Sequence, residues 1–266
     1  MQCGQNVSER CGGHIHIGAS YLTMEESWRN LTEIWVNSEK ILFTISNKAG
    51  EIPRNGIFEY ASPISRNFEE MLNSGNINIE NEESLKYFVK RNQQSRYFGI
   101  NFMNIGDSKD TIEFRLANGT IDADIWIQNI NLFGGIVRSS EDLARIQTKP
   151  GDERTQQEKK MLEYFEQIKK SKISERDKLE ALLSIIIPEE HRDIYRKRYK
   201  VNSKLIEQNS VIKKRIIENV TKSPISIKQV GRKAFLGEDG VTGQEYSQTI
   251  NIIERDLGTK NSEISI

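Results

Sequence analysis

Two short stretches that alternate polar and apolar residues constrain the fold of this chain most strongly. In the first stretch, His14 and His16 alternate with Ile15 and Ile17. A period of two is typical of a strand with one buried face, so the imidazoles are expected to project from the face opposite the isoleucines. Glycines stand on both sides of this segment and allow a close approach of the backbone.

The second stretch, residues 111–116, has the same alternation. Glu113 and Arg115 share one predicted face, and Ile112 and Phe114 share the other. An Asn-Gly turn signal follows this segment directly. Two strands of this kind predict an α+β fold with an antiparallel sheet, in which helices cover one face and ionisable side chains occupy the other.

These side chains have complementary chemistry. A neutral imidazole and a carboxylate can share one divalent cation, and an arginine can bind phosphate oxygens through two parallel hydrogen bonds. Each pair alone has an ordinary interpretation, because a Glu-x-Arg pair often forms a weak ion pair on a solvated strand. Together the two pairs favour a site for a metal ion and an anion.

The sequence resembles the amidoligase family, which belongs with glutamine synthetase and glutamate–cysteine ligase in the carboxylate–amine ligase fold. The resemblance extends from about Cys11 to Val137. It rests on three motifs: Gly12-Gly13-His14-Ile15-His16-Ile17-Gly18, Arg96-Tyr97, and Thr111-Ile112-Glu113-Phe114-Arg115-Leu116-Ala117-Asn118-Gly119-Thr120. The third motif is the most specific of them.

The resemblance implies an ATP-dependent ligase that phosphorylates a carboxylate and lets an amine displace the phosphate. It implies His14 and Glu113 as ligands of a Mg²⁺ ion that bridges ATP phosphates. Arg115 is implied as a catalytic and phosphate-binding group, with Arg96 as a further ATP-binding candidate and His16 as a catalytic residue on the same face. Amino acids, peptides or protein side chains would supply the carboxylate and the amine.

The metal chemistry reveals a departure from the family. Mg²⁺ prefers oxygen ligands, so a histidine ligand should be accompanied by carboxylates. Related proteins carry a Glu-x-Glu strand upstream of the histidine strand, whereas only Glu9 precedes His14 here. We therefore expect a truncated amidoligase that depends on a separate N-terminal segment or associates with itself. A catalytically inactive remnant that binds nucleotide or peptide is a second hypothesis.

A zinc-binding structural module is a third hypothesis. Cys11, His14 and His16, together with Cys3, offer the thiolate and imidazole ligands that suit Zn²⁺. A regular strand would send Cys11 and His14 to opposite faces unless the glycines interrupt the alternation, which argues against this hypothesis.

Composition limits the classes of partner. Lysine and arginine number 38, and aspartate and glutamate also number 38, so no overall field favours nucleic acid or a membrane surface. No apolar run of about 18 residues and no leader sequence is evident, so no membrane partner is expected. Two cysteines do not form a disulfide framework, and a cytoplasmic location is expected.

Helical spacing of apolar residues predicts a helix over residues 24–47, which begins at a capping box of Thr23 and Glu26. Its aromatic residues are expected to pack on the apolar face of the sheet. The loop at residues 48–66 contains Arg54, which we interpret as a solvated arginine in preference to a substrate contact.

The other elements predicted before residue 150 are a helix at 82–93, strands at 97–103 and 111–116, and a helix that Asp122 or Asp124 caps and that extends to Ile136. Gly134 and Gly135 within the last helix predict close packing or a kink.

The composition changes at Pro150-Gly151, where we place a domain boundary. Two or three charged helices are expected beyond it, one starting at Ser174 and another with Pro188 in its first turn. Their basic clusters have acidic neighbours, so solvated faces are expected rather than a nucleic-acid site. The predicted organisation is a partial amidoligase-like domain at residues 1–149, a helical extension at 150–222 and a flexible tail at 223–266.

Overall fold

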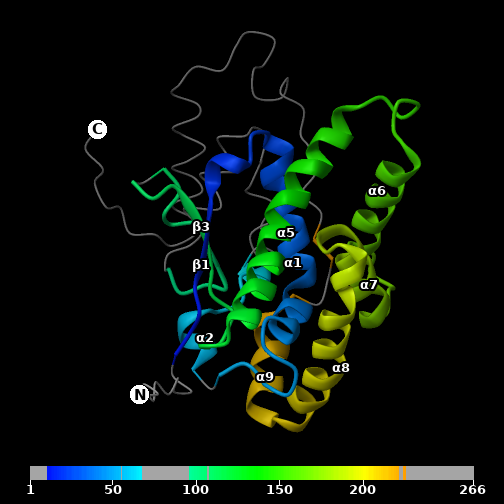
Figure 1. The fold of residues 1–266 in the computed structure, drawn as a ribbon. Coiled ribbons are helices and arrows are strands. Elements are labelled where there is room, and N and C mark those ends of the chain that lie inside the picture. Colours follow the sequence, from blue (N-terminus) through cyan, green and yellow to red (C-terminus); the bar gives the residue numbers. More distant parts are fainter. Residues whose placement is uncertain (1–10, 55, 68–95, 107, 222–223, 226–266) are drawn as a thin grey trace.

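The computed structural model describes residues 11–54, 56–67, 96–106, 108–221 and 224–225. Its architecture is α+β, as predicted, and Figure 1 shows the small sheet beside the helices α1 and α5, with the helices of the extension on the far side of that pair. The predicted helix at 82–93, Cys3, Glu9 and most of the predicted tail lie outside the described residues.

Three strands of the described chain form an antiparallel sheet: β1 (Ile15–Gly18), β2 (Ile100–Asn101) and β3 (Thr111–Phe114). β3 lies between the other two. The register places His16 of β1 opposite Glu113 of β3, and it places Asn101 of β2 opposite Glu113 on the other side. Residues directly opposite each other in a sheet share a face, so this register puts three polar side chains in one row.

Helices α1 (Glu25–Ile45) and α5 (Ala123–Thr148) cover the apolar face of the sheet. The ring of Phe114 stacks on Phe133 of α5, with 4.9 Å between centroids, and lies 5.6 Å from the ring of Trp35 of α1. The isoleucine Ile15 of β1 is buried beside them. The prediction that the aromatic residues of the first long helix form core is confirmed.

The predicted capping box at the start of α1 is wrong. The N-cap is Met24, and no side chain caps the helix from that position. Thr23 instead donates its backbone N–H and its hydroxyl to the Glu141 carboxylate of α5, over 2.9 and 2.5 Å, and Ser27 donates to the same carboxylate over 2.6 Å. A carboxylate from a distant helix therefore compensates the positive end of α1, which a local cap would otherwise do.

The cap of α5 is confirmed, because the Asp122 side chain accepts the N–H of Asp124. The helix continues to Thr148 instead of ending at Ile136, since its later turns also bury apolar side chains. The predicted close packing at the glycine pair is confirmed at Gly135, where a Cβ atom would lie 2.2 Å from the carbonyl oxygen of Ile186.

Four α-helices of the described chain make up the extension, more than the two or three predicted: α6 (Gln156–Ile168), α7 (Glu175–Ile186), α8 (Arg192–Gln208) and α9 (Ser210–Asn219). Ser174 caps α7, as predicted, by accepting the N–H of Asp177. Pro188 precedes the short 3-10 helix η2 (Glu189–His191) and not the first turn of α8. Apolar residues of the extension join the core cluster of the sheet and of α1 and α5.

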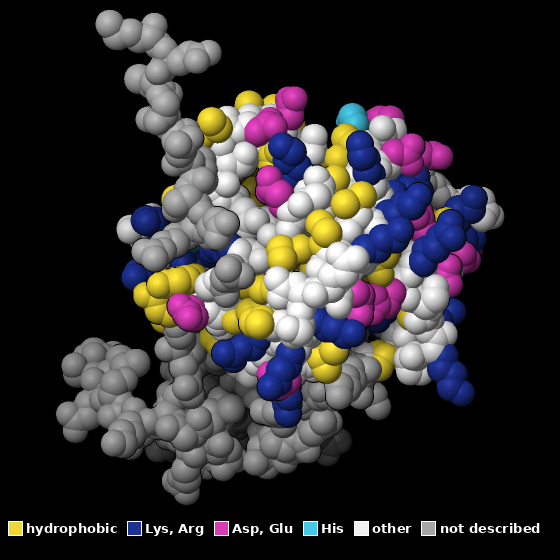
Figure 2. Space-filling view, turned by 90° about the horizontal axis from the view of Figure 1, so that it is seen from below, with side chains coloured by type: hydrophobic (Ala, Val, Ile, Leu, Met, Phe, Trp, Pro, Cys, Tyr) yellow, Lys and Arg dark blue, Asp and Glu magenta, His cyan; other side chains and the backbone are white. Residues whose placement is uncertain are grey.

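Several basic residues of the extension form ion pairs with acidic neighbours. Arg196 lies 2.7 Å from Glu180 and 2.7 Å from Asp193, and Lys213 lies 2.7 Å from Glu207. Figure 2 shows Lys and Arg side chains among Asp, Glu and uncharged ones on the face seen from below. Among the helices that the structure describes, none is long and apolar enough to cross a membrane.

Two short elements complete the part of the fold that positions the site. The 3-10 helix η1 (Ala19–Tyr21) follows β1 directly and leads the chain toward α1. The single-turn helix α2 (Ile57–Tyr60) lies in the segment predicted as loop, and its last residue reaches the polar face of the sheet through a contact with Arg115.

Candidate active site

The carboxylate of Glu113 is the centre of the polar face. Its Oε1 lies 3.0 Å from Nδ1 of His14 and accepts a hydrogen bond of 3.0 Å from Nη1 of Arg115. Its Oε2 accepts a hydrogen bond of 2.6 Å from Nδ2 of Asn101. Nε2 of His16 lies 3.7 Å from Oε1, and Nδ1 of His16 lies 3.0 Å from the hydroxyl of Thr111. The fold thus brings His14, His16 and Arg115 to one carboxylate.

Glu113 is held in its charged form although only 5% of its surface is exposed. Burial alone would raise the pKa of its carboxyl group. Hydrogen bonds from His14 and Asn101 and the positive charge of Arg115 outweigh that effect and lower the pKa to about 2. The site therefore presents a buried, ionised carboxylate at neutral pH.

This lowered pKa predicts an acid-sensitive contribution to stability. The pKa is about 2 in the folded chain against an ordinary 4.5, so the contribution is complete above about pH 5 and is lost as the pH falls from there toward 2. We expect Glu113 to account for a loss of about 2 kcal/mol in unfolding free energy between about pH 7 and pH 3. Urea unfolding of the wild type and of Glu113→Gln at both pH values measures it, and an equal loss in both proteins would contradict it.

The guanidinium of Arg115 is fixed beside Glu113 by a second contact. Its Nε donates to the backbone oxygen of Tyr60 over 2.9 Å, and its centre lies 5.6 Å from the ring centroid of Tyr97. The rings of Tyr60 and Tyr97 meet edge to face at 5.9 Å. Tyr60, the last residue of α2, and Tyr97, which precedes β2, therefore hold the Arg115 side chain in one orientation.

Arg96 lies on the outer side of the same tyrosine. Its guanidinium is 5.3 Å from the Tyr97 ring centroid, and its Nη2 donates to the Tyr97 hydroxyl over 3.4 Å. This hydrogen bond, and next the charge of Tyr97, raise the pKa of Arg96, while the same bond lowers the pKa of Tyr97. One ring is thus contacted by an exposed guanidinium and by the buried guanidinium of Arg115, which is an arrangement suited to an anion.

The prediction that Arg54 is solvated is wrong. Its side chain is buried, and its Nη1 donates to the backbone oxygen of Ala117 over 3.0 Å. A Cβ atom at Gly12 would lie 2.6 Å from Nη2 of Arg54, so the glycine leaves room for the guanidinium. Burial and then the nearby charge of Arg115 lower the pKa of Arg54. The loop folds inward because the Asn118 side chain binds its backbone at Ile52 and Arg54.

The comparisons with known proteins identify the family of this chain. The sequence model of a family described as "putative amidoligase enzyme" matches residues 2–137, about half of the chain. The chain belongs to this amidoligase family. Comparison with curated proteins gave no significant match, and comparison with solved structures gave none either.

The amidoligase match covers each residue that the sequence suggested for the site: His14, His16, Arg96, Glu113 and Arg115. It ends at residue 137, within α5, so the helices α6 to α9 lie outside it.

Sequence reasoning missed two residues of this candidate site. Asn101 donates to Glu113, and the signal was present, because Asn101 alternates with the apolar Ile100 and Phe102 and so belongs to the polar face. Tyr97 belongs to the Arg96-Tyr97 motif, but the sequence assigned it no role in the site. Its contact with both guanidiniums depends on the packing of α2, which strand periodicity does not report.

The side chains of the site fit phosphate groups, and they supply part of the ligand set of one metal ion. Glu113 supplies an anionic oxygen and His14 an imidazole nitrogen 3.0 Å away, while Arg96 and Arg115 offer two guanidiniums. Within the described ranges, no group of three or more His, Cys, Asp or Glu side chains is placed to hold a metal ion. Mg²⁺ keeps several waters and takes phosphate oxygens, so one protein carboxylate is compatible with it.

Proposed function

We propose that this amidoligase is an ATP- and Mg²⁺-dependent ligase that joins a carboxylate to an amine through an acyl phosphate. The observation that carries the proposal is the ionised Glu113 carboxylate, whose Oε1 is contacted by both His14 and Arg115. Phosphoryl transfer demands little covalent chemistry from a protein and much cancellation of charge, and this arrangement offers both signs of charge at one place.

The residues have distinct parts in this proposal. Glu113 and His14 would hold Mg²⁺, which would neutralise negative charge on the phosphates, and ATP would supply the phosphoryl group. Arg115 binds the transferred phosphate, and its contacts with Tyr60 and Glu113 orient it before any substrate arrives. Arg96, exposed at the rim, binds the outer phosphates, and His16 lines the face where the substrate carboxylate binds.

A turnover assay tests the proposal directly. The purified chain, alone and with an added segment that carries a Glu-x-Glu strand, is incubated with ATP, Mg²⁺, and pools of amino acids and peptides. ADP release and amide products are measured by a coupled assay and mass spectrometry. We expect ADP release that requires Mg²⁺ and both a carboxylate and an amine. ADP release that ignores added substrates would contradict the ligase assignment.

The alternative of an inactive, nucleotide-binding remnant is favoured by one observation. Among the described residues, no group of three or more His, Cys, Asp or Glu side chains is placed to hold a metal ion, whereas a histidine ligand of Mg²⁺ is expected to be accompanied by further carboxylates. ATP binding by calorimetry without turnover in any substrate pool would select this alternative.

The zinc alternative depends on Cys3, which lies outside the described residues, and on Cys11, which is exposed. Metal analysis of the purified chain distinguishes it. Stoichiometric zinc whose removal by a chelator unfolds the chain would favour a structural zinc module over a ligase.

Two neighbouring substitutions are expected to separate the site from the core. His14→Ala should weaken Mg²⁺-dependent ATP binding by about tenfold, since it removes one ligand from an exposed position. Ile15→Asp should lower the unfolding free energy by about 3 kcal/mol or more, because it buries an unpaired charge where 7% of the side chain is exposed. Calorimetric titration and urea unfolding measure the two effects.

The two variants serve as controls for each other. If His14→Ala unfolds the chain while Ile15→Asp remains as stable as the wild type, the two faces of β1 have been assigned the wrong way round.

A further inference from the structure

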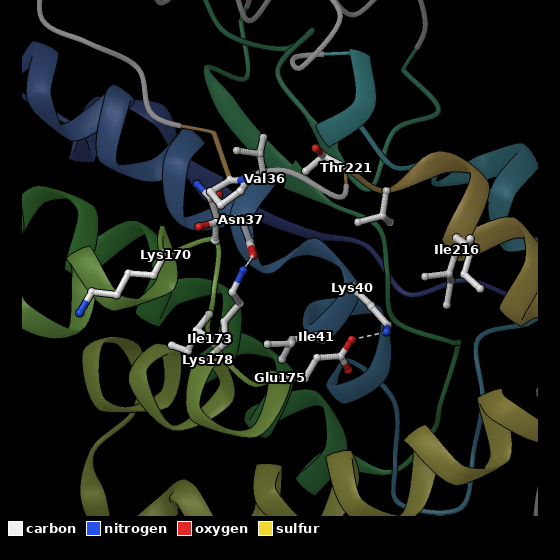
Figure 3. A pocket seen from close by; sticks show the side chains of 14 residues that line it. Val36, Asn37, Lys40, Ile41, Lys170, Ile173, Glu175, Lys178, Ile216 and Thr221 are labelled. Carbon is white, nitrogen blue, oxygen red and sulfur yellow. Dashed lines mark hydrogen bonds and ion pairs between the residues drawn. The ribbon is translucent and has the colours of Figure 1, made fainter.

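A pocket of about 320 Å³ lies on the side of α1 that faces away from the sheet. On α1, Trp35 packs toward Phe114 of the sheet, and the residues that line the pocket, from Val36 to Ile41, lie on the other side of the helix. The start of α7, the end of α9 and the segments next to these two helices supply the other lining residues (Figure 3). The candidate active site and this pocket are therefore separated by the body of α1.

The pocket lining carries an excess of positive charge. Three lysines, Lys40, Lys170 and Lys178, line it together with one carboxylate, Glu175. Glu175 is already engaged, because Lys40 forms an ion pair with it and the Tyr199 hydroxyl donates to it over 2.8 Å. Figure 3 shows the Lys170 side chain directed away from the rest of the lining, so Lys178 supplies the positive charge that favours an anion.

Lys178 is the lysine best placed to receive that anion. Figure 3 shows its side chain reaching from α7 toward α1, where its Nζ donates to the backbone oxygen of Asn37 over 3.2 Å. Burial lowers the pKa of Lys178, against the opposing effect of Glu175. Its ammonium group is thus partly withdrawn from water and bonded to a neutral carbonyl, and an anionic ligand would gain from meeting it there.

The rest of the lining is largely apolar. Ile41 of α1, Ile173 before α7 and Ile216 of α9 contribute to it, with further aliphatic residues around them. The volume lies at the small end of the range for ligand sites, which typically combine an apolar lining with a few polar groups that fix orientation. A small molecule with an apolar body and one anionic end matches both properties.

We infer that this pocket binds a small amphipathic carboxylate, independently of the proposed ligase reaction. The carboxylate pairs with Lys178, and the apolar chain lies against Ile41, Ile173 and Ile216. A ligand of this class would connect α1, α7 and α9, since each of these helices supplies part of the lining.

Isothermal titration of the full chain with octanoate, and with octan-1-ol as the neutral analogue, tests the inference. We expect one saturable octanoate site, with octan-1-ol binding about tenfold more weakly or less. Lys178→Met, which keeps an unbranched apolar side chain, should weaken octanoate binding by about tenfold. Lys160→Met, an exposed lysine on α6 outside the pocket, should leave it unchanged.

A second pair of variants tests the same site without changing Lys178. Ile217 lines the pocket and Val211 does not, and both are exposed side chains of α9 (46% and 64%) that tolerate a polar residue. Ile217→Glu should weaken octanoate binding because its carboxylate repels the anion, whereas Val211→Glu should not.

Three results would overturn the inference. These are equal affinity for octanoate and octan-1-ol, equal effects of Lys178→Met and Lys160→Met, and the absence of saturable octanoate binding below the concentration at which octanoate forms micelles. Because none of these measurements involves ATP, failure here and failure of the ligase proposal are separate outcomes.

Discussion

Glu113→Gln is expected to lower Mg²⁺-dependent turnover by about a hundredfold or more. The substitution keeps the shape of the side chain and removes the negative charge that His14, Asn101 and Arg115 surround. Without that charge, the proposed Mg²⁺ would lose its anionic protein ligand, and Nη1 of Arg115 would keep only a neutral acceptor. The rate of ADP release per folded molecule is the quantity to compare with the wild type.

Stability must be measured in the same variant. The glutamine side chain would present an amide N–H₂ to a ring of donors, and an unmatched buried donor costs about 1–3 kcal/mol. Glu141→Gln is the matched control. Glu141 of α5 is also a buried carboxylate, and it accepts hydrogen bonds from Thr23 and Ser27 at the start of α1. We expect Glu141→Gln to lose stability but to retain turnover per folded molecule. If both variants lose turnover only in proportion to their unfolded fraction, Glu113 has a structural role and the ligase proposal loses its main support.

The two faces of the sheet were predictable because strand periodicity is local. Once residues 15–18 and 111–114 form strands, the pleat alone decides that His16 and Glu113 project away from the core. Periodicity does not determine which strands are neighbours. The antiparallel register does, and it places His16 opposite Glu113, while His14, just before β1, contacts the same carboxylate. Asn101 follows the same alternation, so neutral polar side chains on the polar face of a strand should be considered as site residues together with the charged ones.

The errors share a different cause. The start of α1 was assigned a local cap, but Thr23 binds Glu141, a residue 118 positions further along the chain. Arg54 was assigned to solvent, but Asn118 folds its loop onto the sheet. Both outcomes depend on tertiary contacts between distant segments, and neither leaves a periodic signal near the residue concerned.

Packing of the helical extension against α5 is expected to make Gly135 intolerant of substitution, whereas its neighbour Gly134 should tolerate alanine. A Cβ atom at Gly135 would lie 2.2 Å from the backbone oxygen of Ile186 and 3.2 Å from its carbonyl carbon, so Gly135→Ala must push α7 away from α5. Two hydrogen bonds cross the same contact, from Ser139 to the oxygen of Ile185 and from Arg138 to that of Ile186. We expect a loss of about 3 kcal/mol in unfolding free energy.

Gly134→Ala is the matched control, one residue earlier in the same helix. Its Cβ atom would meet only Ile17, at 4.0 Å, so the substitution should stabilise the chain by about 0.5–1 kcal/mol through the higher helix propensity of alanine. Urea unfolding of both variants measures the difference, and changes of the same sign would contradict the packing of α7 on α5. Gly135 lies inside the amidoligase match and Ile186 outside it, so opposite signs would mean that the extension constrains the amidoligase region directly.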